Sequence, residues 1–253
     1  MKAVKAAIEA AADATAANPI FCAVDTPNLA AAQRLAGQVR GAVGGLKLGL
    51  KFFAAQGPAG VKSMTGEGLP IFLDLKLHDI PNTVAGAMRE AARLCVALTT
   101  VHASGGSAML AAAVKAARDA AKPPKVLAVT MLTSMDSSDL KAMGVARTVQ
   151  EQVRALAETA QEAGCDGVVC SPQEVAPLRA ALPSDFLLLV PGLRSATAAR
   201  NEDQKRVDTP ANAIRAGADY LVIGRTITEA EDPRRAALAV WDEVASARRA
   251  RAH

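Results

Sequence analysis

Residues 72–83 read FLDLKLHDIPNT, an apolar strand that acquires charge just before a proline-led helix. Side chains of a β-strand alternate between two faces, so the three leucines share one face, and Asp74 and Lys76 share the other. The leucines and the apolar residues before them are typical of a strand covered by helices in a parallel sheet. The charged face therefore looks into a cleft. Asp79 follows beyond the strand, and Pro81 has its φ preset for the first turn of a helix.

Seven further strand-like runs, separated by helical segments, occupy 20–25, 45–50, 98–103, 125–132, 167–170, 186–190 and 220–225. Eight strands alternating with helices in 253 residues predict an α/β fold, a single (β/α)8 TIM barrel. We expect one domain over 1–253, with an additional N-terminal helix at 1–18 and a basic tail at 248–253. An open doubly wound sheet is the alternative, but 25–27 read DTP where that fold has a glycine-rich turn.

Composition limits the classes of partner. The net charge is only +4, part of it in the arginines of the last few residues, and aromatic residues make up 3%, which argues against nucleic-acid binding. No run of about 18 apolar residues predicts a membrane span, and acidic residues interrupt any export signal near the N-terminus. Four cysteines without a Cys-x-x-Cys pair and three histidines predict no zinc cluster. We expect reduced thiols and a cytoplasmic protein.

Four charged residues lie near the C-terminal ends of the first three strands, at positions that alternation assigns to the inward face. Asp25 ends the first strand, Lys47 lies in the second, and Asp74 and Lys76 lie in the third. Binding and catalytic groups of α/β barrels sit at the C-terminal ends of the strands, so these charges should converge on one mouth. A pair about 4 Å apart at an effective dielectric near 20 interacts by roughly 4 kcal/mol. Desolvation costs as much or more, so such an array is preorganised rather than net stabilising.

The run DLKLHDIPNT at 74–83 resembles the signature of the orotidine 5′-phosphate decarboxylase family. This resemblance implies removal of CO2 from orotidine 5′-phosphate to give uridine 5′-phosphate, the last step of de novo pyrimidine synthesis. Lys76 would be the proton donor beside Asp74, with Lys47 in the same array. Asp79 and Thr83 would be donated by the partner subunit of a homodimer.

The resemblance extends to the phosphate and base ends of the nucleotide. PGLR at 191–194, the pair Gly224 and Arg225, and the loop DQKRVDTP at 203–210 match the family, and LTS at 132–134 follows strand five. The implied phosphate-side residues are Arg194, Gln204, Gly224 and Arg225. Thr133 would contact the pyrimidine and Asp25 the ribose side, while the loop from 194 to 207 could close over the phosphate.

Two other functions compete with this interpretation. A metal-dependent sugar-phosphate decarboxylase or aldolase resembles the same barrel, but such relatives place an acid on strand two, where this chain has Lys47. A lysine there would repel a divalent cation, so we expect no metal and no cofactor. A non-catalytic phosphate- or nucleic-acid-binding protein is the second alternative. It would have no need for lysines interleaved with acids in the cleft.

Overall fold

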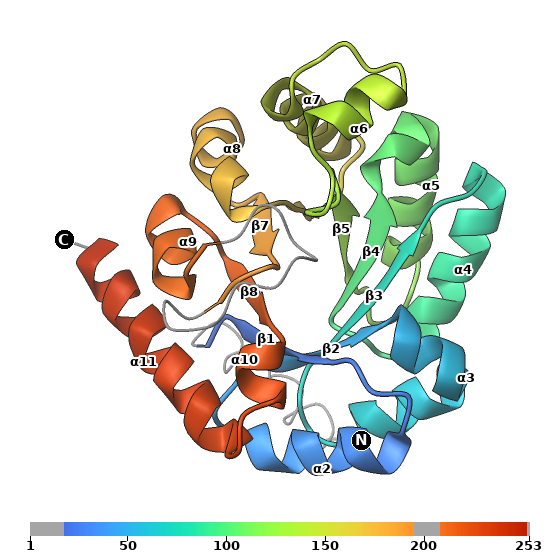
Figure 1. Ribbon diagram of the computed structural model, residues 1–253. Coiled ribbons are helices and arrows are strands. Elements are labelled where there is room, and N and C mark those ends of the chain that lie inside the picture. The colour runs from blue at the N-terminus through green and yellow to red at the C-terminus, as the bar shows by residue number, and fades with distance from the viewer. Residues whose placement is uncertain (1–17, 195–207, 252–253) are drawn as a thin grey trace.

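The computed structural model describes residues 18–194 and 208–251 and is drawn in Figure 1. All strand pairs are parallel, and each strand pairs with the next along the chain. Pairing of the first strand with the last closes the barrel, which confirms the predicted fold class. The strands are β1 (Ile20–Val24), β2 (Gly45–Gly49), β3 (Ile71–Leu77), β4 (Leu98–His102), β5 (Lys125–Val129), β6 (Gly167–Val169), β7 (Leu187–Val190) and β8 (Tyr220–Ile223).

Helices surround the barrel on its outside, as Figure 1 shows. The start of α2 is capped by Asn28, whose side chain accepts from the Ala31 N–H at 2.9 Å. Pro81 opens the helix after β3, where a residue without an N–H leaves one fewer donor unpaired. The helices are α2 (Leu29–Val39), α3 (Leu50–Thr65), α4 (Pro81–Arg93), α5 (Gly106–Arg118), α6 (Ser137–Ala142), α7 (Val149–Glu162), α8 (Val175–Ala181), α9 (Pro210–Ala216), α10 (Arg225–Thr228) and α11 (Pro233–Arg251). Two 3₁₀ turns are η1 (Ala103–Gly105) and η2 (Pro172–Glu174). None of the helices described is both long and apolar enough to cross a membrane.

Two apolar clusters divide the core. The larger cluster lies between the strands and the helices and includes the outward side chains of β3, such as Leu73. The smaller cluster fills the barrel interior and consists of Phe21, Ala23, Phe72, Leu98, Leu127, Val129, Val169, Leu189 and Val222. Every second residue of a strand therefore points inward, as alternation requires. The charged residues of the first three strands also point inward, and they lie nearer the C-terminal ends of the strands than this cluster does.

The Phe21 side chain fills the barrel interior near the N-terminal ends of the strands. Its ring packs edge-on against Phe72, with centroids 5.9 Å apart, and against Tyr220 at 5.6 Å. Gly45 lies opposite Phe21 in the β1–β2 register. A Cβ at position 45 would come within 2.4 Å of the Phe21 ring, so glycine makes room for this aromatic plug.

The structure corrects the predicted end of the fifth strand and the predicted alternation of the third, and it shows how far the last helix extends. Strand β5 ends at Val129 instead of residue 132, which leaves Thr133 in the loop that follows. Strand β3 does not alternate regularly, since Lys76 has a φ of 51° and the β3–β4 register shifts between Leu73 and Leu77. Helix α11 continues to Arg251, so the predicted basic tail is helical through that residue. The expected N-terminal helix, up to residue 17, lies outside the described residues.

Candidate active site

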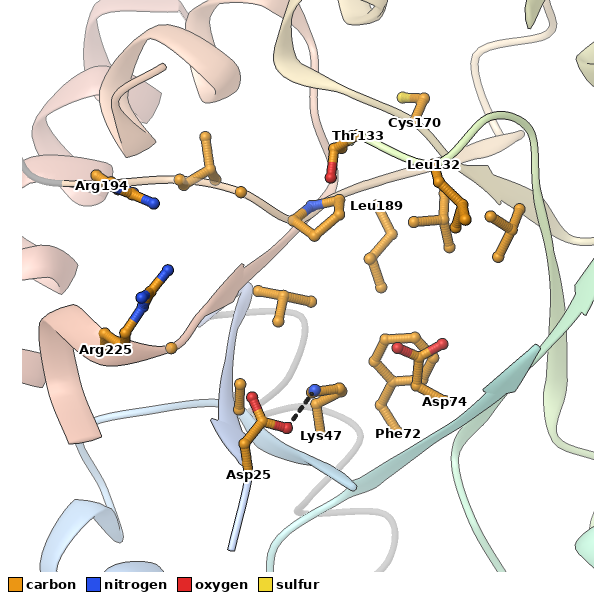
Figure 2. A pocket seen from close by; sticks show the side chains of 18 of the residues that line it. Asp25, Lys47, Phe72, Asp74, Leu132, Thr133, Cys170, Leu189, Arg194 and Arg225 are labelled. Atoms are coloured by element: carbon orange, nitrogen blue, oxygen red, sulfur yellow. Dashed lines mark hydrogen bonds and ion pairs between the residues drawn. The ribbon is translucent and has the colours of Figure 1, made fainter. Parts of the chain in front are cut away.

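A cavity of about 510 Å³ opens at the C-terminal ends of the strands, within the size range of small-molecule sites. Its floor is the top of the interior apolar cluster, including Phe72, Val129 and Leu189. Polar and charged residues form its walls, and Figure 2 shows several of them pointing inward. Those predicted from sequence that line it are Asp25, Lys47, Asp74, Lys76, Thr133, Arg194, Gly224 and Arg225.

Lys47 pairs with Asp25, which follows the neighbouring strand β1. The Lys47 Nζ lies 2.8 Å from Asp25 Oδ1, and Figure 2 marks this contact. The lysine side chain is only 12% exposed, whereas the carboxylate is 58% exposed. Gly49 lies beside the pair, because a Cβ there would be 3.1 Å from Lys47 Nζ. At one edge of the cavity, a largely buried ammonium group is therefore paired with a largely exposed carboxylate.

Lys76 and Asp74 form the second ion pair, with 2.6 Å between Nζ and Oδ2. The pair is more enclosed than the first, with side-chain exposures of 28% and 13%. The four charged residues predicted to form an alternating array form two ion pairs, one between β2 and the end of β1 and one within β3. A cation held against a carboxylate in a cleft can stabilise a developing anion and donate a proton.

Sequence reasoning missed Thr100, on β4 next to this pair. Its hydroxyl donates to Asp74 Oδ1 at 2.9 Å and accepts from the backbone N–H of Lys76 at 2.9 Å. Strand alternation could have found it, because Leu98 points into the barrel and Thr100 lies two residues further on. The run LTTVH offers two threonines, however, and an uncharged side chain gave no reason to single one out.

The opposite side of the cavity carries two arginines. Arg194 follows β7 and Arg225 follows β8, and Figure 2 shows both on one side of the pocket, apart from Asp25, Lys47 and Asp74. The backbone N–H of Arg194 donates to the carbonyl of Asp208 at 3.1 Å, which anchors this end of the loop. Guanidinium groups match the geometry of phosphate oxygens, so this side suits an anion.

Two predicted site residues in the described part of the chain, Asp79 and Thr83, do not line the cavity. Gln204 lies outside the described residues. Asp79 and Thr83 are exposed, and the Asp79 carboxylate accepts from the Ile80 N–H at 2.6 Å. A single chain therefore does not bring these two residues to its own cavity.

Two titratable groups lie close to the charged wall. Burial lowers the pKa of His102 below its ordinary 6.5, and nearby His78 and Lys76 lower it further, with Asp74 opposing them. The rings of His78 and His102 lie 5.5 Å apart. Burial, followed by the charge of Asp25, raises the pKa of Cys22 to about 12, so that thiol stays protonated and is a poor nucleophile.

The described ranges, 18–194 and 208–251, hold no group of three or more His, Cys, Asp or Glu side chains that could hold a metal ion. The charged residues that line the cavity are two lysines, two arginines and three carboxylates, Asp25, Asp74 and Glu229. Asp25 and Asp74 each have a lysine partner. The donor set therefore suits an anionic organic substrate.

Comparison with known proteins gives one consistent result. Residues 3–240 match the family described as orotidine 5′-phosphate decarboxylase / HUMPS. An orotidine 5′-phosphate decarboxylase from Paramagnetospirillum magneticum is 54% identical over 225 residues, covering 87% of this chain and 95% of the relative. The enzyme of that name from Rhodospirillum rubrum is 53% identical over 233 residues, covering 90% and 94%.

Solved structures agree with the sequence relatives. The crystal structure of orotidine 5′-phosphate decarboxylase from Lactobacillus acidophilus superposes with a TM-score of 0.80 at 36% identity, covering 90% of this chain and 99% of that one. An uncharacterized conserved protein from Geobacillus kaustophilus superposes with a TM-score of 0.76 at 35% identity, covering 89% and 100%. On the family match and these relatives, the chain belongs to the orotidine 5′-phosphate decarboxylase / HUMPS family.

Proposed function

We infer that this chain converts orotidine 5′-phosphate to uridine 5′-phosphate and CO2, the last step of de novo pyrimidine nucleotide synthesis, and we propose that it needs no cofactor. The activity is that of its curated relatives at 53–55% identity over most of the chain. The observation that carries the mechanism is the Lys76–Asp74 ion pair, which lines one side of a cavity whose other side holds two arginines.

Lys76 is the proton donor in this mechanism. When the bond from C6 to the carboxylate breaks, CO2 leaves and the electron pair stays on C6, in an orbital that the pyrimidine ring does not delocalise. An ammonium group beside C6 stabilises that charge and then transfers its proton to C6. Asp74 holds the ammonium in place at 2.6 Å and stands on the side of the departing carboxylate, where repulsion is relieved as CO2 leaves.

The remaining wall residues bind the nucleotide. Arg194 and Arg225 take the phosphate, together with the backbone at Gly224 and with Gln204 of the loop. Thr133 contacts the pyrimidine, and the Asp25–Lys47 pair holds the ribose side, with Lys47 continuing the charged array toward C6. Binding energy gained at the phosphate, remote from C6, can be used in the transition state.

We propose that the active unit is a two-fold homodimer in which Asp79 and Thr83 complete the partner's site. Both residues are exposed in the single chain, and neither lines its own cavity. Ile80, next to Asp79, is 68% exposed, and Leu50 at the start of α3 is 58% exposed. Large exposed apolar side chains that follow the C-terminal ends of β2 and β3 favour burial against a second copy.

Hybrid dimers test this assembly. Lys76→Ala and Asp79→Ala dimers should each be nearly inactive, because every site lacks one member of the array. Co-refolding the two variants yields hybrids in about half the dimers, each with one intact site, so roughly a quarter of wild-type activity should return. No recovery, with hybrids confirmed by mass spectrometry, would place Asp79 in its own subunit's site.

A metal-dependent sugar-phosphate reaction on this barrel is the main alternative. Lys47, paired with Asp25 at the cavity edge, puts a positive charge where that chemistry needs a metal ligand. Turnover of orotidylate in excess EDTA separates the two reactions. We expect an unchanged rate. Loss of activity on chelation, with recovery on adding Mg²⁺, would contradict the cofactor-free mechanism.

The cysteines bear on the cellular location of the enzyme. We propose that it acts in the cytoplasm, because Cys22 and Cys165 are buried cysteines outside any disulfide, as suits a reducing compartment. Its substrate is a single nucleotide held in an enclosed cavity, and we assign it no nucleic-acid partner. Fractionation with a thiol-trapping reagent would check both the location and the redox state.

A further inference from the structure

The strand that carries the proton donor is irregular where it meets β4. Leu73 lies opposite Thr99 and Leu77 lies opposite Val101, so β3 has extra residues between these two pairs. Lys76 lies in this stretch with a φ of 51°, the left-handed region that favours glycine. A lysine adopts such a backbone only where its surroundings hold it there.

The hydroxyl of Thr100 accepts a backbone hydrogen bond where the regular β3–β4 pairing is interrupted. The backbone N–H of Lys76 donates to Thr100 Oγ1 at 2.9 Å, in place of a carbonyl of β4. The same hydroxyl donates to Asp74 Oδ1 at 2.9 Å, while Asp74 Oδ2 receives the Lys76 ammonium at 2.6 Å. The contacts form a ring that holds Lys76 at its backbone and at its tip. A hydroxyl has one donor and two acceptor sites, so it can serve both partners at once.

We propose that Thr100 is a positioning residue that sets the proton donor Lys76 in its reactive geometry. The proposal rests on the role of Lys76 under "Proposed function". Thr100 itself is fully buried and is absent from the cavity wall, so it acts through the ion pair and does not touch substrate. Its branched Cβ restricts the side-chain torsion, which keeps the hydroxyl aimed at both partners.

The effect of removing the hydroxyl should fall on turnover. Without it, the Lys76 N–H and one Asp74 oxygen lose their partner inside a buried site, and the ammonium is free to leave the position beside C6. A misplaced catalytic group slows the chemical step even when the substrate still binds. Because the phosphate and ribose contacts lie elsewhere in the cavity, affinity for the nucleotide should stay nearly constant.

The chain offers a matched control on the same strand. Thr99 is as fully buried as Thr100, but its hydroxyl has no hydrogen-bond partner among the described residues. Thr99→Val and Thr100→Val are therefore the same near-isosteric change at adjacent buried positions. Only the second removes contacts to Asp74 and Lys76.

The experiment compares Thr100→Val, Thr100→Ser and Thr99→Val by steady-state kinetics with orotidylate and by calorimetric binding of uridylate. Thr100→Val should lower kcat by about 10- to 100-fold, the loss of one or two hydrogen bonds to charged or strained groups. Its KM and its uridylate Kd should change by no more than about 3-fold, since remote binding contacts remain. Thr100→Ser should restore most of kcat, and Thr99→Val should keep it.

Thermal melts establish that each variant is folded, and Thr100→Ala replaces Thr100→Val if the valine variant does not fold. Wild-type kcat in Thr100→Val would overturn the proposal, as would an equal loss in Thr99→Val or a loss confined to KM. The Lys76→Ala variant, measured in the same assay, distinguishes failure of the proton-donor assignment from failure of the positioning role of Thr100. Activity in Lys76→Ala would refute the proton-donor assignment itself, whereas an inactive Lys76→Ala with an unaffected Thr100→Val refutes only the positioning role.

Discussion

Replacing Arg225 by alanine should weaken catalysis through the phosphate of the substrate. Arg225 begins α10 after β8 and lines the cavity on the side away from the Lys76–Asp74 pair. The variant should therefore lose interactions with the nucleotide's phosphate and leave the decarboxylation array unchanged.

The magnitude follows from the contacts at stake. Hydrogen bonds to charged groups contribute about 1.5–3 kcal/mol each, so a two-bond arginine fork is worth roughly 3–6 kcal/mol. Arg194 remains in the cavity wall of the variant, and Arg225 is itself exposed, so screening favours the lower end. At about 1.36 kcal/mol per factor of ten, kcat/KM for orotidylate should fall about 100- to 1000-fold.

The assay compares orotidylate with orotidine, which lacks the phosphate. Orotidine is turned over far more slowly by any enzyme that uses phosphate binding, but Arg225→Ala should leave that slow rate nearly unchanged. Arg215→Ala is the matched control, since Arg215 is exposed on α9, contacts Asn212 and does not line the cavity. An equal loss on both substrates would place the phosphate elsewhere and refute this reasoning.

Two further predictions concern stability. Gly45→Ala should lower the free energy of unfolding in urea by about 1–3 kcal/mol, because the added Cβ would lie 2.4 Å from the Phe21 ring. Gly37→Ala on α2, with no atom within 4 Å, should instead raise it by about 0.5–1 kcal/mol, and the reverse order would refute the packing argument. The lowered pKa of His102, due first to burial and then to His78 and Lys76, means that the folded protein favours the neutral ring. The free energy of unfolding should therefore be highest above pH 6.5, the ordinary pKa of a histidine. It should fall as the pH drops from 6.5 toward the lowered pKa of His102 in the folded protein. Melting temperatures of His102→Asn should depend less on pH in this range, and an identical pH dependence would assign the effect to another group.

Much of the fold could be predicted because its signals are local. Alternation in Leu-rich strands and their regular spacing with helices are enough to specify an eight-stranded barrel, and the inward phase of Asp74 follows from the same rule. The convergence of the charged residues on one mouth followed from the fold, because parallel strands present their C-terminal ends at one rim.

What could not be predicted depends on contacts between strands. The left-handed backbone of Lys76 carries no sequence signal, since glycine would be the expected residue there. The pairing of Lys47 with Asp25 depends on the spacing of β1 and β2 and on Gly49 beside the lysine. The proposed role of Asp79 in a neighbouring site depends on a second copy of the chain, which the sequence of one copy does not position.

The central claim is that Lys76 delivers the proton to C6, and kcat of Lys76→Ala tests it most directly. The variant should fold and bind uridylate, because the side chain lines a cavity and supports no apolar packing. Its turnover of orotidylate should be abolished. Retention of a tenth of wild-type kcat, a loss of only about 1.4 kcal/mol in transition-state stabilisation, would contradict the assignment of Lys76 as the proton donor.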